Sequence, residues 1–239
     1  YLEAHYARQG YAPIKDMYYW RLSNIEGRVE ALRRRRPAAP LPDGFAIRKF
    51  DMKNLKRDLG ILREVFNDAW SANWGFVPLQ PEEVEAVASE MKPFVKPEYG
   101  IIMHDGDLPA AVAMILPNIY EITADLGPEP SPFGWLKLGW RALTHRFQTG
   151  FVLMLGISRR YQKSVGGAVI AMKMVDEIIT RMLPYEDKSG WLEAGWVLDD
   201  NTPLQKILKR QGFETKRQIR LFSKDIAEFT SPEQQVHHD

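Results

Sequence analysis

The chain has 239 residues, of which 45% are hydrophobic and 26% are charged, a composition typical of a globular protein with one large domain or two small ones. Its 32 basic and 31 acidic residues nearly cancel, so the net charge does not indicate a nucleic-acid partner. The chain contains no cysteine, which excludes disulfides, thiolate metal sites and cysteine nucleophiles. Neither a membrane-spanning apolar run nor a signal-peptide pattern is found, so we expect a cytoplasmic protein.

The first residues share a pattern with the end of the chain. Arg8-Gln-Gly-Tyr11 and Arg210-Gln-Gly-Phe213 each follow a short helical pattern and precede a strand pattern. Such a duplication predicts two related domains, and a chance match of four residues is the alternative. Because the chain begins at Tyr rather than Met, we expect that an upstream half precedes it. The predicted divisions are the end of that half at 1–23, a linker at 24–43, the main domain at 44–226 and a polar tail at 227–239.

The main domain begins with strand and helix patterns in alternation. We predict a strand at Phe45–Phe50, a helix at Leu55–Trp70, a second helix from Pro81, and a hairpin formed by Tyr99–Met103 and Ala110–Leu116. His104 falls in the predicted turn of this hairpin and is therefore not expected to be catalytic.

Polar and aromatic residues follow two of these elements. Trp70, Asn73 and Trp74 lie after the first helix, and large aromatic side chains outside a regular element need either a ligand or loop packing around them. Asn118 and Glu121 lie where the second hairpin strand ends. We therefore treat Trp70, Asn73, Trp74 and Asn118 as candidate substrate contacts, with loop packing as the alternative.

The segment Phe133–Phe147 has an amphipathic helical pattern. One face carries apolar residues that include Trp140, and the other carries Lys137, Arg141 and His145. Basic residues opposite tryptophan are typical of a helix at a membrane interface, but a surface helix packed on the sheet has the same pattern. Trp140 is a candidate contact for an apolar substrate tail in either case.

The central stretch runs from an apolar strand, Phe151–Ile157, through a basic loop with two glycines into a long helix. A helix that begins with glycine exposes free backbone N–H groups, and its dipole favours a phosphate there. Close backbone packing is the alternative reason for Gly166 and Gly167. After the long helix come a strand at Trp191–Leu198, Asn201, and a short helix that ends at Gly212-Phe213.

This order resembles the GCN5-related N-acetyltransferase (GNAT) superfamily. Lys163-x-x-Gly166-x-Ala168 is similar to its Gln/Arg-x-x-Gly-x-Gly/Ala loop, and Asn201 to Phe213 is similar to its last helix. The resemblance implies an α/β (α+β) fold with a mixed, mostly antiparallel sheet, flanking helices and splayed fourth and fifth strands.

The same resemblance implies where acyl-CoA would bind. Pantetheine would lie along the fourth strand, at Leu155, Gly156 and Ile157. The pyrophosphate would lie on the loop before the long helix, at Gln162, Lys163, Ser164, Val165, Gly166, Gly167 and Ala168. The tyrosine that many members use as a general acid is replaced here by Leu208, which excludes a tyrosine-dependent proton relay at that position.

Three residues are candidate catalytic groups for attack of an amine on a thioester. Glu193 lies inside an apolar strand, so its carboxylate must be partnered, protonated or at an open site. Glu121 at the strand exit is a second candidate base, and either could act through water. Asn201 could contact the cofactor or cap the following helix. We expect no metal.

Several segments resemble, more narrowly, a proteobacterial group of two-domain acyltransferases that includes the bacterial ceramide synthase. They include Asn67-Asp-Ala-Trp70, Asn73-Trp-Gly-Phe-Val-Pro78 and the run Trp196-Val-Leu-Asp-Asp-Asn201. The resemblance implies transfer of a long acyl chain to a sphingoid-type amine, a tandem half upstream and contact with the inner membrane. Two alternatives remain open: a GNAT acetyltransferase of a small amine or amino acid, and a non-catalytic acyl-CoA-binding half.

Overall fold

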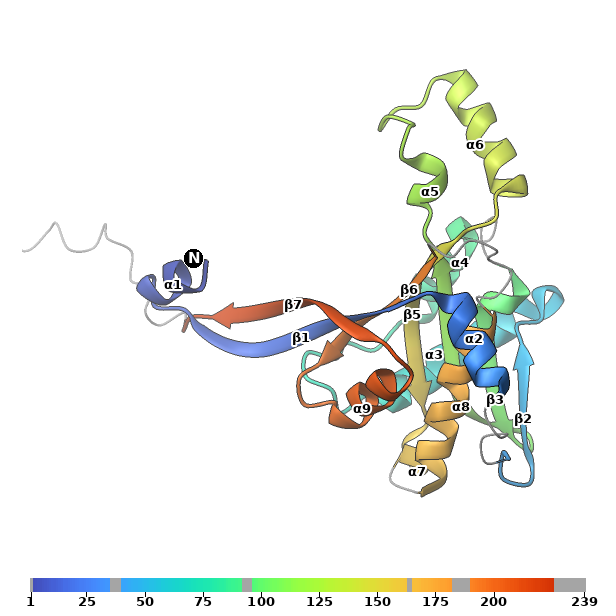
Figure 1. Ribbon diagram of the computed structural model, residues 1–239, viewed down its shortest axis with the longest axis horizontal. Helices are drawn as coiled ribbons and strands as arrows, with labels where there is room; N and C mark the ends of the chain where they lie inside the picture. Colours follow the sequence, from blue (N-terminus) through green and yellow to red (C-terminus); the bar gives the residue numbers. More distant parts are fainter. Residues whose placement is uncertain (1, 35–39, 92–95, 163–164, 182–189, 226–239) are drawn as a thin grey trace, which may run out of the picture.

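The computed structural model describes residues 2–34, 40–91, 96–162, 165–181 and 190–225 (Figure 1). Within these residues a single sheet has the strand order β2-β3-β4-β5-β6-β1-β7. The strands are β1 (Ala12–Ser23), β2 (Phe45–Lys49), β3 (Gly100–Asp105), β4 (Leu108–Pro117), β5 (Thr149–Ile157), β6 (Trp191–Leu198) and β7 (Glu214–Ser223). The α-helices are α1 (Leu2–Arg8), α2 (Ile25–Arg34), α3 (Leu55–Trp70), α4 (Pro81–Met91), α5 (Tyr120–Thr123), α6 (Pro132–Thr144), α7 (Arg159–Gln162), α8 (Val165–Arg181) and α9 (Thr202–Arg210). Short 3-10 turns occupy Met52–Asn54 and Pro97–Tyr99.

The sheet is antiparallel except where β5 meets β6. These two strands run parallel from the pair Thr149 and Trp191 to the pair Val152 and Ala194. Both strands continue, β5 to Ile157 and β6 to Leu198, but they pair no further. They therefore separate, which confirms the predicted mixed sheet with splayed fourth and fifth strands.

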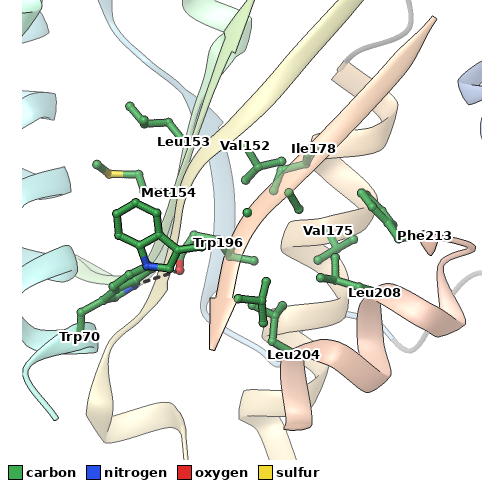
Figure 2. Close-up of a pocket in the computed structure, with 14 residues that line it drawn as sticks. Trp70, Val152, Leu153, Met154, Val175, Ile178, Trp196, Leu204, Leu208 and Phe213 are labelled. Carbon is green, nitrogen blue, oxygen red and sulfur yellow. Dashed lines mark hydrogen bonds between the residues drawn. The ribbon is translucent and has the colours of Figure 1, made fainter. Parts of the chain in front are cut away.

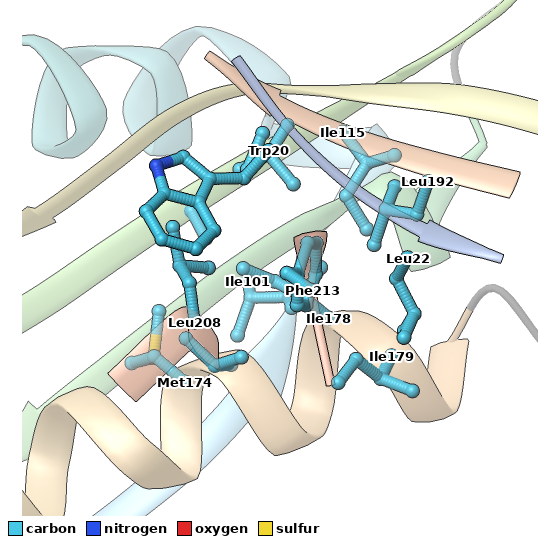
Figure 3. Close-up of a cluster of buried hydrophobic side chains, with 14 of the residues drawn as sticks. Trp20, Leu22, Ile101, Ile115, Met174, Ile178, Ile179, Leu192, Leu208 and Phe213 are labelled. Atoms are coloured by element: carbon cyan, nitrogen blue, oxygen red, sulfur yellow. The ribbon is translucent and has the colours of Figure 1, made fainter. Parts of the chain in front are cut away.

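Helix α8 covers one face of the sheet because its apolar residues recur on one side. Ile170, Met174 and Ile178 are buried at intervals of four residues. They pack in a core that also contains Ile101 of β3 and Ile115 of β4 (Figure 3). The long helix predicted after the central loop is therefore α8.

Helix α3 covers the opposite face. Leu59, Leu62 and Val65 pack against Val112 and Met114 of β4. The intervening residues of β4 belong to the core beneath α8, as the two-residue period of a strand requires. The two helix layers therefore fix β4 in the centre of the domain.

A buried ion pair attaches α3 to the first strand of the main domain. Arg48 of β2 donates to both carboxylate oxygens of Asp58, at 2.6 and 2.8 Å. The backbone N–H of Asp51 donates to Asp58 as well, at 2.7 Å. His104 lies in β3 rather than in the turn, and Nε of Arg48 donates to its ring at 3.2 Å. The first strand of the hairpin therefore continues two residues beyond the predicted end at Met103.

The N-terminal strand lies inside the sheet. β1 pairs with β6 through Met17–Ser23 on one side and with β7 along almost its whole length on the other. Its first residues, Ala12 to Asp16, pair with β7 alone, so the two strands leave the body as a ribbon that carries α1 at its tip (Figure 1). The origin of residues 1–23 in an upstream half stays a prediction.

Helices α5 and α6 connect β4 to β5 and stand out beyond the end of the sheet (Figure 1). Asp125, between the helices, accepts hydrogen bonds from Lys137, at 2.6 Å, and from Arg141. Leu138 and Ala142 are the α6 residues that pack on the core. In the part of the chain that the structure describes, no helix has the length and hydropathy needed to cross a membrane.

Candidate active site between β5 and β6

A pocket opens where β5 and β6 separate (Figure 2). It holds about 480 Å³ of space, including the part that is open to solvent. Residues from α3, β5, α8, β6 and α9 line it, among them Trp70, Leu153, Val175, Trp196, Leu204 and Leu208. Among the described residues, every one that lines the pocket is uncharged, so the pocket suits an apolar group better than a polar one.

The backbone of β5 is open to a ligand on its β6 side. Because pairing with β6 ends at Val152, the following peptide groups need other partners. The indole N–H of Trp70 supplies one of them, since it donates to the carbonyl oxygen of Leu155 at 3.3 Å (Figure 2). Leu153 and Trp196 are about half exposed at the mouth. The part of β5 beyond Val152 therefore borders the pocket without β6 paired to it.

The predicted pantetheine residues lie along this part of β5. Leu155 lines the pocket. Gly156 is buried beneath α3, where an added Cβ would lie 3.4 Å from Cβ of Ala69. The carbonyl of Ile157 accepts from the Gln162 side chain at 2.7 Å. Only Leu155 of the three therefore borders the pocket, and the pantetheine assignment stays a prediction.

The loop before α8 contains one turn of helix, α7. Gln162 ends α7, and its side chain also donates to the carbonyl of Ala69, at 3.1 Å. An added Cβ on Gly167 would lie 2.1 Å from the carbonyl oxygen of Tyr161, so close backbone packing explains this glycine. Gly166 beside it is partly exposed, and Ala168 is exposed.

The remaining predicted phosphate residues are placed only in part. Val165 is the first residue of α8, whereas Lys163 and Ser164 lie outside the described residues. The first turn of α8 follows the end of β5 and α7, as the predicted order of strand, loop and helix requires. Its role in phosphate binding stays a prediction.

Glu193 is buried and doubly paired. One carboxylate oxygen accepts from Nε and Nη2 of Arg21, at 3.2 and 2.8 Å, and the other accepts from Nη2 of Arg217, at 2.8 Å. Its side chain is 1% exposed and does not line the pocket, although the adjacent Ala194 does. Of the three states that the sequence allowed for this carboxylate, the structure shows the partnered one. Its role as a base stays a prediction, and the geometry fits a structural role better.

Glu121 ties α5 to the start of β5. Its carboxylate accepts from the backbone N–H groups of Gln148 and Thr149, at 2.9 and 2.7 Å, from the Thr149 hydroxyl, and from the His145 ring at 2.9 Å. Burial alone would raise the pKa of this carboxyl, but these hydrogen bonds outweigh burial and hold the pKa below its ordinary value. A base with a lowered pKa takes a proton less readily. Asn118 joins the same cluster by donating to the Thr149 hydroxyl at 2.9 Å.

Asn201 caps α9. Its side-chain oxygen accepts from the backbone N–H of Leu204 at 3.3 Å, the bond expected of an N-cap residue. The alternative contact with a cofactor stays a prediction.

Among the predicted substrate contacts, Trp70 alone lines the pocket. Trp74 is half exposed in the turn after α3, and the N–H of Asn73 donates to the Trp70 carbonyl at 2.8 Å. Trp140 lies on α6, away from the lining. The sequence did not lead us to Trp196 and Leu204, which also line the pocket. Their position on the strand and the helix that follow the long helix could have indicated them. Within the described residues, no group of three histidine, aspartate or glutamate side chains could hold a metal ion.

Comparisons with known proteins agree with this geometry. No family model matches the chain. A crystal structure of a GCN5-related N-acetyltransferase from Sphaerobacter thermophilus superposes with a TM-score of 0.58 and 14% identity, over 92% of this chain and 55% of that one. The chain has the GNAT fold. The splayed GNAT strands are therefore β5 and β6 here, and the long GNAT helix is α8.

Two curated proteins are similar in sequence to this GNAT-fold chain. Protein YghO of Escherichia coli is 34% identical over 180 residues, which are 75% of this chain and 46% of that protein. The bacterial ceramide synthase of Caulobacter vibrioides is 28% identical over 218 residues, which are 91% of this chain and 56% of that protein. The chain spans about half the length of the curated relatives it matches.

Proposed function

We propose that this chain transfers an acyl group from acyl-CoA to an amine, with the acyl group in the pocket between β5 and β6. The uncharged lining of that pocket carries the proposal, because it lies beside the part of β5 that β6 does not pair with, and β5 leads through α7 to the first turn of α8. The backbone of β5 would bind the pantetheine amides, and the N-terminal turn of α8 would bind the phosphates. Similarity to the Caulobacter ceramide synthase supports the same reaction class.

The reaction places modest demands on the protein. A neutral amine attacks the thioester carbonyl carbon, a C–N bond forms, the C–S bond breaks, and CoA leaves as a thiol with the proton that the amine loses. Glu193 and Glu121 already accept bonds at both oxygens, so each would take the proton only through water. Neither carboxylate lines the pocket. Leu208 at the tyrosine position adds apolar lining instead of a proton donor.

The substrates that fit best are a long-chain acyl-CoA and a sphingoid-type base. Each methylene group that enters an apolar pocket contributes about 0.8 kcal/mol. A lining without charged groups therefore favours a long acyl chain over an acetyl group. The sphingoid acceptor is proposed from the similarity to the ceramide synthase.

One observation favours a second candidate, a non-catalytic acyl-CoA-binding half. In the described residues no carboxylate lines the pocket, and an acyltransferase needs some group to remove the amine proton. A chain that only binds acyl-CoA needs none. The two candidates share the binding site and differ in turnover.

A thiol-release assay separates these candidates. The chain contains no cysteine, so a thiol reagent reports released CoA without a signal from the protein. Palmitoyl-CoA and acetyl-CoA are each tested with sphinganine, ethanolamine and no amine. Sphinganine-dependent release from palmitoyl-CoA supports the proposal, whereas binding without release supports the non-catalytic half. Release from acetyl-CoA with the small amine alone would make the chain a small-amine acetyltransferase.

A further inference from the structure

Helix α6 turns an apolar surface toward solvent. Phe133, Leu136, Trp140 and Leu143 are 83, 69, 69 and 86% exposed, and Trp135 is 61% exposed. Single exposed apolar residues are common, but a group of five on one helix marks an interaction surface. We call these five residues the α6 apolar surface.

The active site does not use this surface. No α6 residue lines the pocket, and α6 packs on the core through Leu138 and Ala142 instead. The hairpin of α5 and α6 also stands out from the body of the protein (Figure 1), so a broad surface can reach α6. The α6 apolar surface therefore faces a partner outside the described chain.

The five side chains are spread so widely around α6 that a continuous apolar medium fits them better than a single partner helix. At about 100° per residue, the arc from Phe133 through Trp140, Leu136 and Leu143 to Trp135 covers about 160° of the helix circumference. A helix from a second copy would contact a narrower stripe. A helix of 13 residues is about 20 Å long and offers far less area than the roughly 800 Å² per partner of a stable interface. A lipid bilayer covers the whole arc.

The charges of the hairpin lie where lipid headgroups would be. Lys137 and Arg141 follow Phe133 at the edge of the arc, and both pair with the carboxylate of Asp125. Glu121 is engaged with His145 and the start of β5. Cations beside an apolar, tryptophan-containing face are what an interfacial helix presents to anionic headgroups.

We propose that α6 lies in the interfacial layer of an anionic lipid bilayer, with the α6 apolar surface among the acyl chains and Lys137 at the headgroups. The inference is independent of the proposed reaction. A protein held at the bilayer in this way would meet amphiphilic substrates where they are concentrated.

Vesicle sedimentation with the full chain tests this inference. One set of vesicles contains phosphatidylcholine alone, and a second also contains phosphatidylglycerol. The variant carries Trp140→Ser and Leu143→Ser. The control carries Leu108→Ser and Ile14→Ser, which remove apolar side chains that are 50 and 45% exposed at other places on the protein. We expect the parent and the control to bind the anionic vesicles alike. The variant should bind them about tenfold more weakly or worse, because it loses two large apolar groups that would enter the bilayer.

Two outcomes would overturn the inference. One is a parent chain that binds neither set of vesicles, and the other is a folded variant that binds as the parent does. If the parent is dimeric in solution and does not bind vesicles, and the variant is monomeric, the surface contacts a second copy instead. If the double variant does not fold, Leu143→Asp, at the most exposed residue of the α6 apolar surface, provides the same comparison.

Discussion

Replacing Glu193 with glutamine should destabilise the fold. The carboxylate lies on β6 and joins Arg21 of β1 to Arg217 of β7, so one buried charge holds three neighbouring strands. Each guanidinium also lies over an aromatic ring: Arg21 over Trp191 at 4.2 Å and Arg217 over Tyr19 at 4.4 Å. Glutamine keeps the shape of the side chain but removes the charge that both arginines face.

The size of the effect follows from the burial of the three groups. Breaking a fully buried ion pair costs about 3–5 kcal/mol. Here the side chains of Arg21 and Arg217 are 33 and 60% exposed, so water recovers part of that loss. We expect Glu193→Gln to lower the free energy of unfolding by about 2–3 kcal/mol, equivalent to a fall of about 4–12 °C in Tm for a chain of this size.

Urea unfolding followed by circular dichroism measures this loss directly. Glu214→Gln is the matched control, because Glu214 is 75% exposed and pairs with the exposed Lys216, so its removal should cost less than about 0.5 kcal/mol. Adding Arg217→Gln to Glu193→Gln should cost less than the sum of the two single changes. A stability loss equal to that of the control, together with lost turnover, would contradict this reasoning and identify Glu193 as the base.

Three further predictions concern the loop before α8 and the hairpin contact at β5. Gly166→Glu should weaken acyl-CoA binding in calorimetry without a change in Tm, because it adds a negative charge beside the proposed phosphates at a partly exposed position; unchanged affinity would remove the phosphate assignment. Gly167→Ala should lower the free energy of unfolding by about 1–3 kcal/mol, since its Cβ would meet the Tyr161 carbonyl oxygen, and a Tm equal to the parent's would refute that packing. The pKa of Glu121 is lowered in the folded state, so its stabilisation is complete above its ordinary pKa and is lost as the pH falls through the lowered value. The Tm difference between the parent and Glu121→Gln should therefore narrow from about pH 6 to about pH 3, and a constant difference would contradict this.

Local patterns in the sequence predicted many of the helices and strands. The apolar spacing in Leu55–Trp70 predicted α3 with its observed bounds, and the resemblance to the GNAT superfamily implied the splayed pair. Asn201 shows the limit of such patterns, because capping and cofactor contact require the same residue type. The structure shows the capping bond.

Long-range contacts could not be predicted. Glu193 was recognised as needing a partner, but its arginines lie 172 and 24 residues away in the sequence. Both are brought to it because β1 lies between β6 and β7. The pattern of Phe133–Phe147 likewise revealed an amphipathic helix but not which medium its apolar face would meet, because that depends on how the hairpin leaves the sheet.

The affinity of acyl-CoA as a function of chain length tests the proposed pocket most directly. Calorimetry with CoA, acetyl-CoA and palmitoyl-CoA is compared between the parent and Leu153→Asp, which places a charge at the half-exposed mouth. If at least four methylene groups enter the pocket, palmitoyl-CoA should bind the parent about 100-fold more tightly than acetyl-CoA. Leu153→Asp should remove most of that preference, and the variant with Trp140→Ser and Leu143→Ser should keep it. Equal affinity of the parent for the two donors, or a preference that Leu153→Asp leaves intact, would show that the acyl chain does not lie between β5 and β6.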